Sequence, residues 1–366
     1  MVQHLADHST HNTFSCCWFI GDSPQNKVQA NMVLGVGVVG LGKMGLLHAG
    51  IINSLPSGRV VAICEKEGML VKAARQLLPS ISFYDTVDAM LEKERLDAIY
   101  VTTPIQTHAR IIETIVDSLP SAGIFSEKPL AADMVEARKI AEMVSSKKVV
   151  NMVGLQKRFG VTFKRAKQLL DAGAIGRVQF FRSGSYVSDI FRHGVGWRFQ
   201  KGSGGVLLDL SPHLIDLLLW YFEDVKVLSA VAKSFYSSEV EDYVHATLET
   251  RAGAVGSFEV SWSARNYRIP EIMIEVQGDG GSLTITDDHI EIDADQSLPG
   301  IIASGKSILR RADFDTSVPF LLADPEFTVE DEYFLTTVQN RSRAQPDFEA
   351  GTRVNEFIDM VHHGMR

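Results

Sequence analysis

One stretch of the chain holds carboxylates and a histidine at helical spacing. Asp209, His213 and Asp216 stand at i, i+4 and i+7 in an apolar segment, so on a continuous helix they would share one face. A carboxylate one turn from a histidine can fix its tautomer, which makes His213 a candidate general base oriented by Asp209. A second interpretation stays open, because Ser211 could cap a helix that starts at Pro212 and leave Asp209 outside it. The non-catalytic alternative is a structural Asp–His pair inside a packed helix.

A second stretch, Glu127-Lys128-Pro129, follows an expected strand over residues 122–125. A lysine at a strand end, followed by proline, could reach both a cofactor and a substrate. Its ammonium group could then stabilise negative charge on a reacting oxygen. The tripeptide also fits a solvated loop with a helix-starting proline. The surrounding elements must decide between these two interpretations.

The elements around these residues begin with a glycine-rich turn. An apolar, β-branched run over residues 33–40 predicts a strand buried in a parallel sheet, and Gly40-Leu41-Gly42-Lys43-Met44-Gly45 leads from it into a helix. Such glycines permit a tight turn, let a pyrophosphate approach the backbone and let the helix pack on the strand. Glu65 ends the second strand, where an acid binds ribose hydroxyls and repels a 2′-phosphate. Lys66 could neutralise that phosphate, so the pattern favours NAD and leaves NADP open.

Strands and helices alternate up to residue 154, which predicts a doubly wound parallel sheet of the Rossmann kind. Ligands bind at the carboxyl ends of such strands. We therefore expect Thr103, Pro104 and His108, together with Glu127 and Lys128, to line the dinucleotide. A histidine that starts a helix can equally be an exposed cap, and both interpretations of His108 remain open.

The pattern beyond residue 154 predicts a second, α+β domain. Its expected strands form an open, predominantly antiparallel sheet and cover residues 177–188, 225–236, 243–250, 254–263, 272–278 and 282–286. Residues 297–324 have no periodicity and are expected to form a long loop, and closing helices are expected at 326–341 and 348–365. The predicted domains are an N-terminal extension at 1–31, a dinucleotide-binding domain at 32–153 and a substrate-binding and oligomerisation domain at 154–366. Self-association could cover the open sheet face, so a homodimer or homotetramer is expected.

Composition excludes several classes of partner. A formal charge of −9 argues against nucleic acid or an anionic membrane, since both require basic surfaces. Three cysteines are too few for a disulfide framework, and no apolar run has the length of a membrane span, so a cytoplasmic protein is expected. His4, His8, His11, Cys16 and Cys17 lie in the extension without any sign of fixed geometry. A flexible extension without a bound metal is the preferred interpretation there.

These motifs, combined with Arg158-Phe159, Trp197-Arg198 and Gly204-Gly205, resemble the Gfo/Idh/MocA family of glucose-fructose oxidoreductase and inositol dehydrogenase from about Val33 to the C-terminus. The resemblance implies hydride transfer between NAD(P) and a secondary alcohol or ketone of a sugar, inositol or sugar derivative. It also implies that Lys128 lies beside the nicotinamide ribose and the substrate hydroxyl, with Asp209 and His213 completing the proton-handling site. Further substrate contacts are expected from Arg158, Tyr186, Trp197 and Arg198, although each could instead be a packing or surface residue. The N-terminal extension departs from the usual start of the family.

Two other functions remain open at this point. An NAD-dependent glycosidase on the same scaffold would hydrolyse its substrate without net formation of NADH. A non-catalytic NAD-binding regulatory protein would bind the dinucleotide and turn over nothing. The presence of Lys128, Asp209 and His213 together speaks against the second alternative.

Overall fold

The computed structural model describes residues 32–189, 197–201, 204–314 and 318–365, and residues 33–366 form one compact unit. A parallel sheet of six strands occupies its first half, in the order β3-β2-β1-β4-β5-β6. Its strands are β1 (Leu34–Val39), β2 (Gly58–Cys64), β3 (Ser82–Tyr84), β4 (Ala98–Val101), β5 (Gly123–Ser126) and β6 (Asn151–Val153). The connecting helices are α1 (Lys43–Ser54), α2 (Gly68–Leu77), α3 (Val87–Lys93), α4 (His108–Ser118) and α5 (Met134–Ser146). The predicted doubly wound parallel sheet is confirmed.

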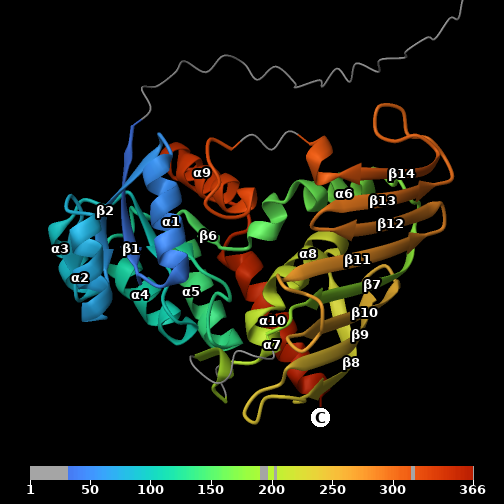
Figure 1. Cartoon of the computed structure of the whole chain (residues 1–366), viewed down its shortest axis with the longest axis horizontal. Coiled ribbons are helices and arrows are strands. Elements are labelled where there is room, and N and C mark those ends of the chain that lie inside the picture. Colours follow the sequence, from blue (N-terminus) through green and yellow to red (C-terminus); the bar gives the residue numbers. More distant parts are fainter. Residues whose placement is uncertain (1–31, 190–196, 202–203, 315–317, 366) are drawn as a thin grey trace, which may run out of the picture. The chain divides into compact units, whose positions relative to one another are not determined.

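A helix from the end of the chain completes the core of this first sheet. Helix α9 (Pro325–Asn340) lies beside α1 (Figure 1), and its Phe334 packs against Tyr100 and Phe125 of the central strands. All three rings are fully buried. The dinucleotide-type domain is therefore built from two separate parts of the sequence.

A second sheet holds eight strands in the order β14-β13-β12-β11-β7-β10-β9-β8. Among the described strands of this sheet, only the neighbours β7 and β10 run parallel, so the predominantly antiparallel sheet is also confirmed. Its strands are β7 (Val178–Tyr186), β8 (Val225–Lys233), β9 (Tyr243–Thr250), β10 (Val255–Ser261), β11 (Glu271–Gly278), β12 (Gly281–Thr286), β13 (His289–Ala294) and β14 (Gly305–Arg310). The prediction of a long loop at 297–324 was wrong in part, because β14 lies within this range. As an edge strand with one exposed face, β14 has no strong hydrophobic alternation.

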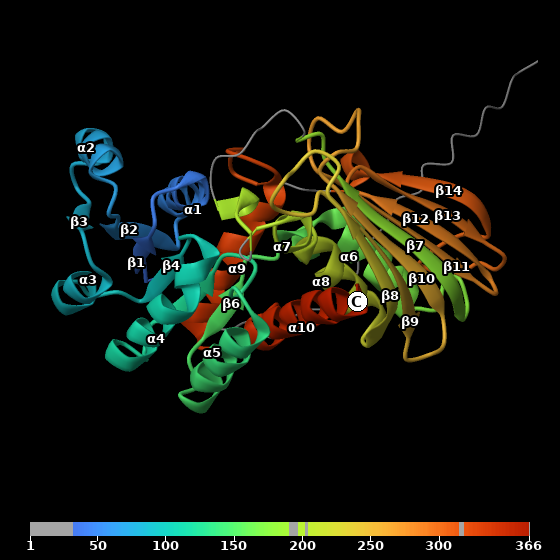
Figure 2. The same ribbon diagram turned by 90° about the horizontal axis from the view of Figure 1, so that it is seen from below.

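Helices cover one face of the second sheet. Phe181 of β7 stacks on Phe222 of α8 (Pro212–Phe222), and Phe258 of β10 packs on Phe357 of α10 (Phe348–Gly364). Helix α6 (Val161–Asp171) also packs on this sheet, and Figure 2 shows all three helices on the same side of the strands. None of the described helices is long and apolar enough to cross a membrane.

The chain breaks its helix between Asp209 and His213. Helix α7 (Val206–Asp209) ends before Ser211, and α8 begins at Pro212, whose missing N–H suits a first helical position. The Ser211 hydroxyl does not cap α8 but donates to the Leu207 backbone oxygen. Of the two interpretations left open by the sequence, the structure therefore has the helix that starts at Pro212.

Candidate active site

The glycine turn between β1 and α1 fits a dinucleotide. A side chain at Gly45 would lie 2.0 Å from the Gly40 backbone oxygen, whereas Gly42 faces open space. The first turn of α1 has no side-chain cap and no acidic residue, so the amides after Gly42 are available to a phosphate. Of the other predicted contacts in this turn, Lys43 is exposed and Met44 is half-buried.

Glu65 is fixed at the edge of this turn by two backbone amides. Its carboxylate accepts hydrogen bonds from Leu41 N at 2.6 Å and from Glu67 N at 2.8 Å. Both bonds hold a negative charge beside the turn at the end of β2, where the sequence predicted a ribose-binding acid. Lys66 is exposed beside it.

The loop after β4 closes against the glycine turn. A side chain at Gly40 would lie 2.9 Å from Thr103 Cγ2, and the Thr102 hydroxyl donates to the Gly40 backbone oxygen at 2.8 Å. Pro104 is exposed in the same loop. The structure thus places Thr103 against the glycine turn, and the contact of Thr103 and Pro104 with the dinucleotide stays a prediction.

His108 was expected either to line the dinucleotide or to be an exposed helix cap, and its ring has other partners. The ring is buried, with Nε2 2.8 Å from the Thr103 backbone oxygen and Nδ1 3.1 Å from the Pro129 backbone oxygen. Burial lowers the pKa of His108, and a neutral imidazole can donate to only one of the two carbonyls. The residue is neither an exposed cap nor a cofactor donor, because its ring nitrogens face the chain. It joins the Thr103 loop to the loop that carries Lys128.

Lys128 meets the second half of the chain at Asp209. The Lys128 ammonium group donates to the Asp209 backbone oxygen and lies 3.8 Å from Asp209 Oδ1. The Asp209 carboxylate also forms an ion pair with Arg198 at 2.6 Å. Arg198 forms a second ion pair with Asp189 at 3.0 Å. Arg198 further lies over the Trp262 ring, 5.2 Å from its centroid. These side chains are only partly exposed, so the charges are held in place at the rim of the site.

No hydrogen bond or ion pair joins His213 to Asp209 in the described part of the chain, which corrects the predicted pair. The Nδ1 of His213 is buried and has no hydrogen-bond partner among the described residues, and Asp209 is engaged by Lys128 and Arg198 instead. Burial, followed by the positive charges of Lys128 and Lys157, lowers the pKa of His213 well below its usual value. The imidazole is therefore neutral near pH 7 and able to accept a proton. Asp209 ends α7 and His213 lies in the first turn of α8, so the two residues belong to separate helices.

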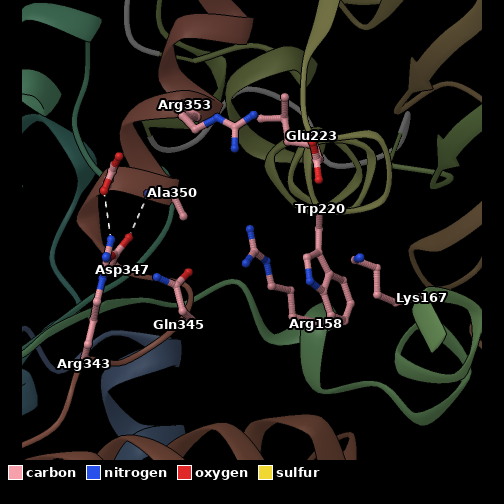
Figure 3. Close-up of a pocket in the computed structure, with 11 residues that line it drawn as sticks. Arg158, Lys167, Trp220, Glu223, Arg343, Gln345, Asp347, Ala350 and Arg353 are labelled. Carbon is pink, nitrogen blue, oxygen red and sulfur yellow. Dashed lines mark hydrogen bonds and ion pairs between the residues drawn. The ribbon is translucent and has the colours of Figure 1, made fainter. Parts of the chain in front are cut away.

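Arg158 forms an ion pair with Asp216, which lies three residues after His213 on α8. The Arg158 guanidinium donates to both carboxylate oxygens of buried Asp216, at 2.7 and 2.6 Å. Figure 3 shows Arg158 beside Trp220 in a cavity that Gln345 also lines, at the C-terminal half of α8 rather than at His213. The structure therefore places the predicted substrate contact Arg158 in this cavity, where it is paired with Asp216.

Tyr186 also lies away from the proposed chemistry. It is on the face of the second sheet opposite the helices, since Phe181, Ser183 and Ser185 of the same strand are the buried residues. Its ring lies 5.1 Å from that of Tyr267. The predicted substrate contact at Tyr186 therefore does not meet His213, because strand alternation points it to the other face. Trp197 begins a short 3-10 helix at Trp197–Phe199, and its side chain lies outside the described part of the structure.

Glu127 turns inward rather than toward a ligand. Its carboxylate is buried, accepts from Lys128 N at 3.1 Å and lies 3.1 Å from His48 Nε2. The sequence pattern predicted a cofactor contact at Glu127 and did not indicate His48. A signal was available, because a histidine one turn after the third glycine falls on the buried side of α1.

Lys157 is another residue that the sequence did not indicate. It forms a largely buried ion pair with Asp287 and contributes to the positive potential at His213. Its approach to His213 depends on the packing of separate elements, so no local pattern could have revealed it. Among the residues that the structure describes, no group of three or more histidine, cysteine or acidic side chains is arranged to hold a metal ion.

The two halves of the chain match two family models. Residues 34–155 match the model described as "Oxidoreductase family, NAD-binding Rossmann fold", and residues 163–284 match the GFO/IDH/MocA C-terminal domain. The chain belongs to the GFO/IDH/MocA oxidoreductase family. The recognition made from the motifs is thereby confirmed, together with an NAD-binding Rossmann fold.

Relatives in this family include several dehydrogenases. The chain is 26% identical over 266 residues to scyllo-inositol 2-dehydrogenase (NAD(+)) of Bacillus subtilis, covering 70% of this chain and 75% of the relative. It is 27% identical over 289 residues to levoglucosan dehydrogenase of Pseudarthrobacter phenanthrenivorans, covering 68% of this chain and 73% of the relative. A solved structure of levoglucosan dehydrogenase with NADH and levoglucosan superposes with a TM-score of 0.81 at 22% identity, covering 91% of this chain and 97% of the other. This last similarity establishes the shared fold.

Proposed function

We propose that this protein is an NAD-dependent dehydrogenase that interconverts a secondary alcohol and a ketone on a sugar or cyclic polyol. The observation that carries the proposal is the meeting of Lys128, from the end of β5, with the Asp209–His213 segment of the second half. Two candidate proton-handling groups thus meet beyond the carboxyl end of β5, and such strand ends form the ligand crevice of parallel sheets. Named relatives act on inositols and on levoglucosan, which supports a polyhydroxylated substrate.

The cofactor would be held by the residues of the first sheet. Backbone amides after Gly42 would bind the pyrophosphate, Glu65 would bind the adenosine ribose, and Thr103 and Pro104 would lie along the dinucleotide. When bound, NAD supplies the hydride acceptor for the oxidation.

His213 would accept the proton of the substrate hydroxyl at its imidazole ring. The lowered pKa keeps the ring neutral, so one ring nitrogen can accept the hydroxyl proton. Lys128 would donate a hydrogen bond to the reacting oxygen and stabilise the negative charge that develops there. The positive charge of Lys128 also disfavours protonated His213, so the ring would readily pass its proton on to solvent.

Asp209 takes a different role from the one its spacing predicted. Its backbone oxygen and carboxylate both hold the Lys128 ammonium group, and Arg198 holds the carboxylate from the other side. We assign Asp209 and Arg198 to the positioning of Lys128. Either side chain could still contact substrate, since both are partly exposed.

A panel experiment tests the proposed function. Purified protein is incubated with NAD or NADP and with sugars, inositols and sugar acids, and the absorbance of reduced nicotinamide is followed. We expect net NADH formation with at least one polyol and its loss in Lys128→Ala and His213→Ala. Product formation without net NADH would favour a glycosidase, and binding of NADH without any turnover across the panel would favour a non-catalytic protein.

The uncovered face of the second sheet supports a homo-oligomer. Apolar side chains on this face remain exposed, among them Phe180, Val231, Val255 and Ile308. Monomeric proteins rarely leave such a surface open, so a second copy of the chain is the occupant we propose. Light scattering coupled to gel filtration would distinguish a homodimer or homotetramer from a monomer.

A further inference from the structure

A buried charged bridge lies behind the proposed active site. His48 of α1 is fully buried, with Nδ1 2.9 and 3.0 Å from the two carboxylate oxygens of Asp331 and Nε2 3.1 Å from Glu127 Oε1. Asp331 belongs to α9, 283 residues further along the chain. One imidazole ring therefore connects three elements that are distant in sequence.

The surroundings of His48 favour its charged form. Burial alone would lower the pKa of His48, but the charges and hydrogen bonds of Asp331 and Glu127 raise it well above its usual value. Burial likewise favours a neutral Glu127, yet the hydrogen bond and charge of His48 lower the pKa of that carboxyl. Both ring nitrogens face carboxyl groups, and a doubly protonated imidazole can donate to both of them. Burial raises the pKa of Asp331, while the charge and hydrogen bond of His48 oppose that rise.

Glu330 and Tyr100 also face this bridge and are uncharged, and the positive charge of Lys128 further lowers the pKa of Glu127. Burial raises the pKa of Glu330 on α9 well above its usual value and so keeps that acid neutral. Burial and the charge of Asp331 do the same for the Tyr100 phenol of β4. The rings of Phe125 and Phe327 pack at 5.0 and 6.2 Å from the His48 ring and exclude water. The His48 contacts therefore lie in a setting where electrostatic interactions are strong.

The bridge ends at the backbone of the proposed catalytic lysine. Glu127 uses one carboxylate oxygen for His48 and the other for Lys128 N, at 3.1 Å. In the other direction, α1 begins at Lys43, in the glycine turn that fits the pyrophosphate. His48 lies three residues after Gly45, the last glycine of that turn. His48 thus links the cofactor helix to the residue that would hold the reacting oxygen.

We propose that His48 is a positioning residue for hydride transfer, which acts by fixing Glu127 and through it the Lys128 backbone. This inference rests on the proposed function of Lys128. An apolar core of similar volume could be at least as stable as a buried ionic bridge, so stability alone does not require these charges. The directional contacts of His48 instead set the distance between the cofactor turn and Lys128, where small misplacements lower the rate strongly.

The test compares His48→Gln with Ile51→Ala. Ile51 is a fully buried apolar residue on the same helix, and its truncation destabilises the domain without touching Glu127. We expect His48→Gln to lower kcat by about 10-fold to 100-fold while the Kd for NADH changes by less than about 3-fold. Ile51→Ala should keep kcat near that of the wild type. Asp331→Asn, which keeps the shape of the side chain, should lower kcat in the same direction.

Two further measurements separate positioning from general loss of structure. Without the His48 charge the pKa of Glu127 should rise, so infrared difference spectroscopy should find the protonated Glu127 carboxyl at higher pH in His48→Gln than in the wild type or Ile51→Ala. Hydrogen–deuterium exchange needs no substrate, and the Lys128 amide should exchange faster in His48→Gln than in Ile51→Ala.

Unchanged exchange at Lys128, or wild-type kcat in folded His48→Gln or Asp331→Asn, would overturn the inference. The proposed function fails in a different way, namely if Lys128→Ala keeps full turnover or the wild type oxidises nothing in the panel. Should His48→Gln not fold, Asp331→Asn gives the same comparison with Ile51→Ala.

Discussion

The fixed position of Glu65 predicts that the protein selects NAD over NADP. Two backbone amides, from Leu41 and Glu67, hold the carboxylate beside the glycine turn, so it cannot rotate away from an incoming 2′-phosphate. Two unit charges ~4 Å apart interact by ~1 kcal/mol in water and ~4 kcal/mol at an effective dielectric constant of ~20. A half-buried group lies between these limits, which corresponds to roughly 5-fold to several hundredfold weaker binding of the phosphate.

Binding of NADH and NADPH, followed by nicotinamide fluorescence, measures this selectivity without a substrate. Glu65→Gln removes the charge and keeps most of the shape, so the ratio of the two Kd values should fall toward one. Glu92→Gln is the matched control, because it removes the same charge from the exposed surface of α3. Lys66→Gln should increase the preference for NADH, since the exposed ammonium group can partly neutralise the phosphate.

Two results would refute this reasoning. Equal affinity of the wild type for NADH and NADPH would mean that Lys66 outweighs Glu65. An unchanged ratio in Glu65→Gln would mean that the Glu65 carboxylate does not face the adenosine ribose.

The remaining predictions concern the chemistry and the core. Lys128→Ala and His213→Ala should each lower kcat by about 10²-fold to 10⁴-fold with little change in NADH affinity, measured by steady-state kinetics and fluorescence; near-normal rates would remove that residue from the mechanism. Lys157→Met removes a positive charge that lowers the pKa of His213, so that pKa should rise and the acid limb of the pH–rate profile should move to higher pH; an unmoved limb would contradict the assignment of that limb to His213. Phe334→Ala should reduce the free energy of unfolding by about 3 to 5 kcal/mol in urea denaturation, because the ring is fully buried against Tyr100 and Phe125; a loss below about 1 kcal/mol would mean that α9 is not part of that core.

Local sequence patterns were sufficient for the first sheet and its glycine turn. Strand and helix periodicity, the spacing of Gly40, Gly42 and Gly45, and the acid at Glu65 are all set within a few residues or one βαβ unit. Lys128 could be singled out for the same reason, since its place after an expected strand predicts a position in the ligand crevice. Strand β14 was not predicted, because the hydrophobic alternation of this exposed edge strand is weak.

The partners of the site residues were decided only by tertiary structure. Helical spacing paired Asp209 with His213, but tertiary packing brings Lys128 and Arg198 to the Asp209 carboxylate instead. Strand alternation, together with the side on which the helices pack, turned Tyr186 away from His213.

The sequence by itself determined a dinucleotide-binding domain, an antiparallel second domain and the lysine at their meeting point. It could not determine what holds that lysine, because His48, Glu127 and Asp331 come together from three elements. Periodicity records which face of an element is buried, whereas the identity of the neighbour across that face depends on long-range packing. Electrostatic effects such as the lowered pKa of His213 depend on the same packing, since burial and charges from separate segments create them.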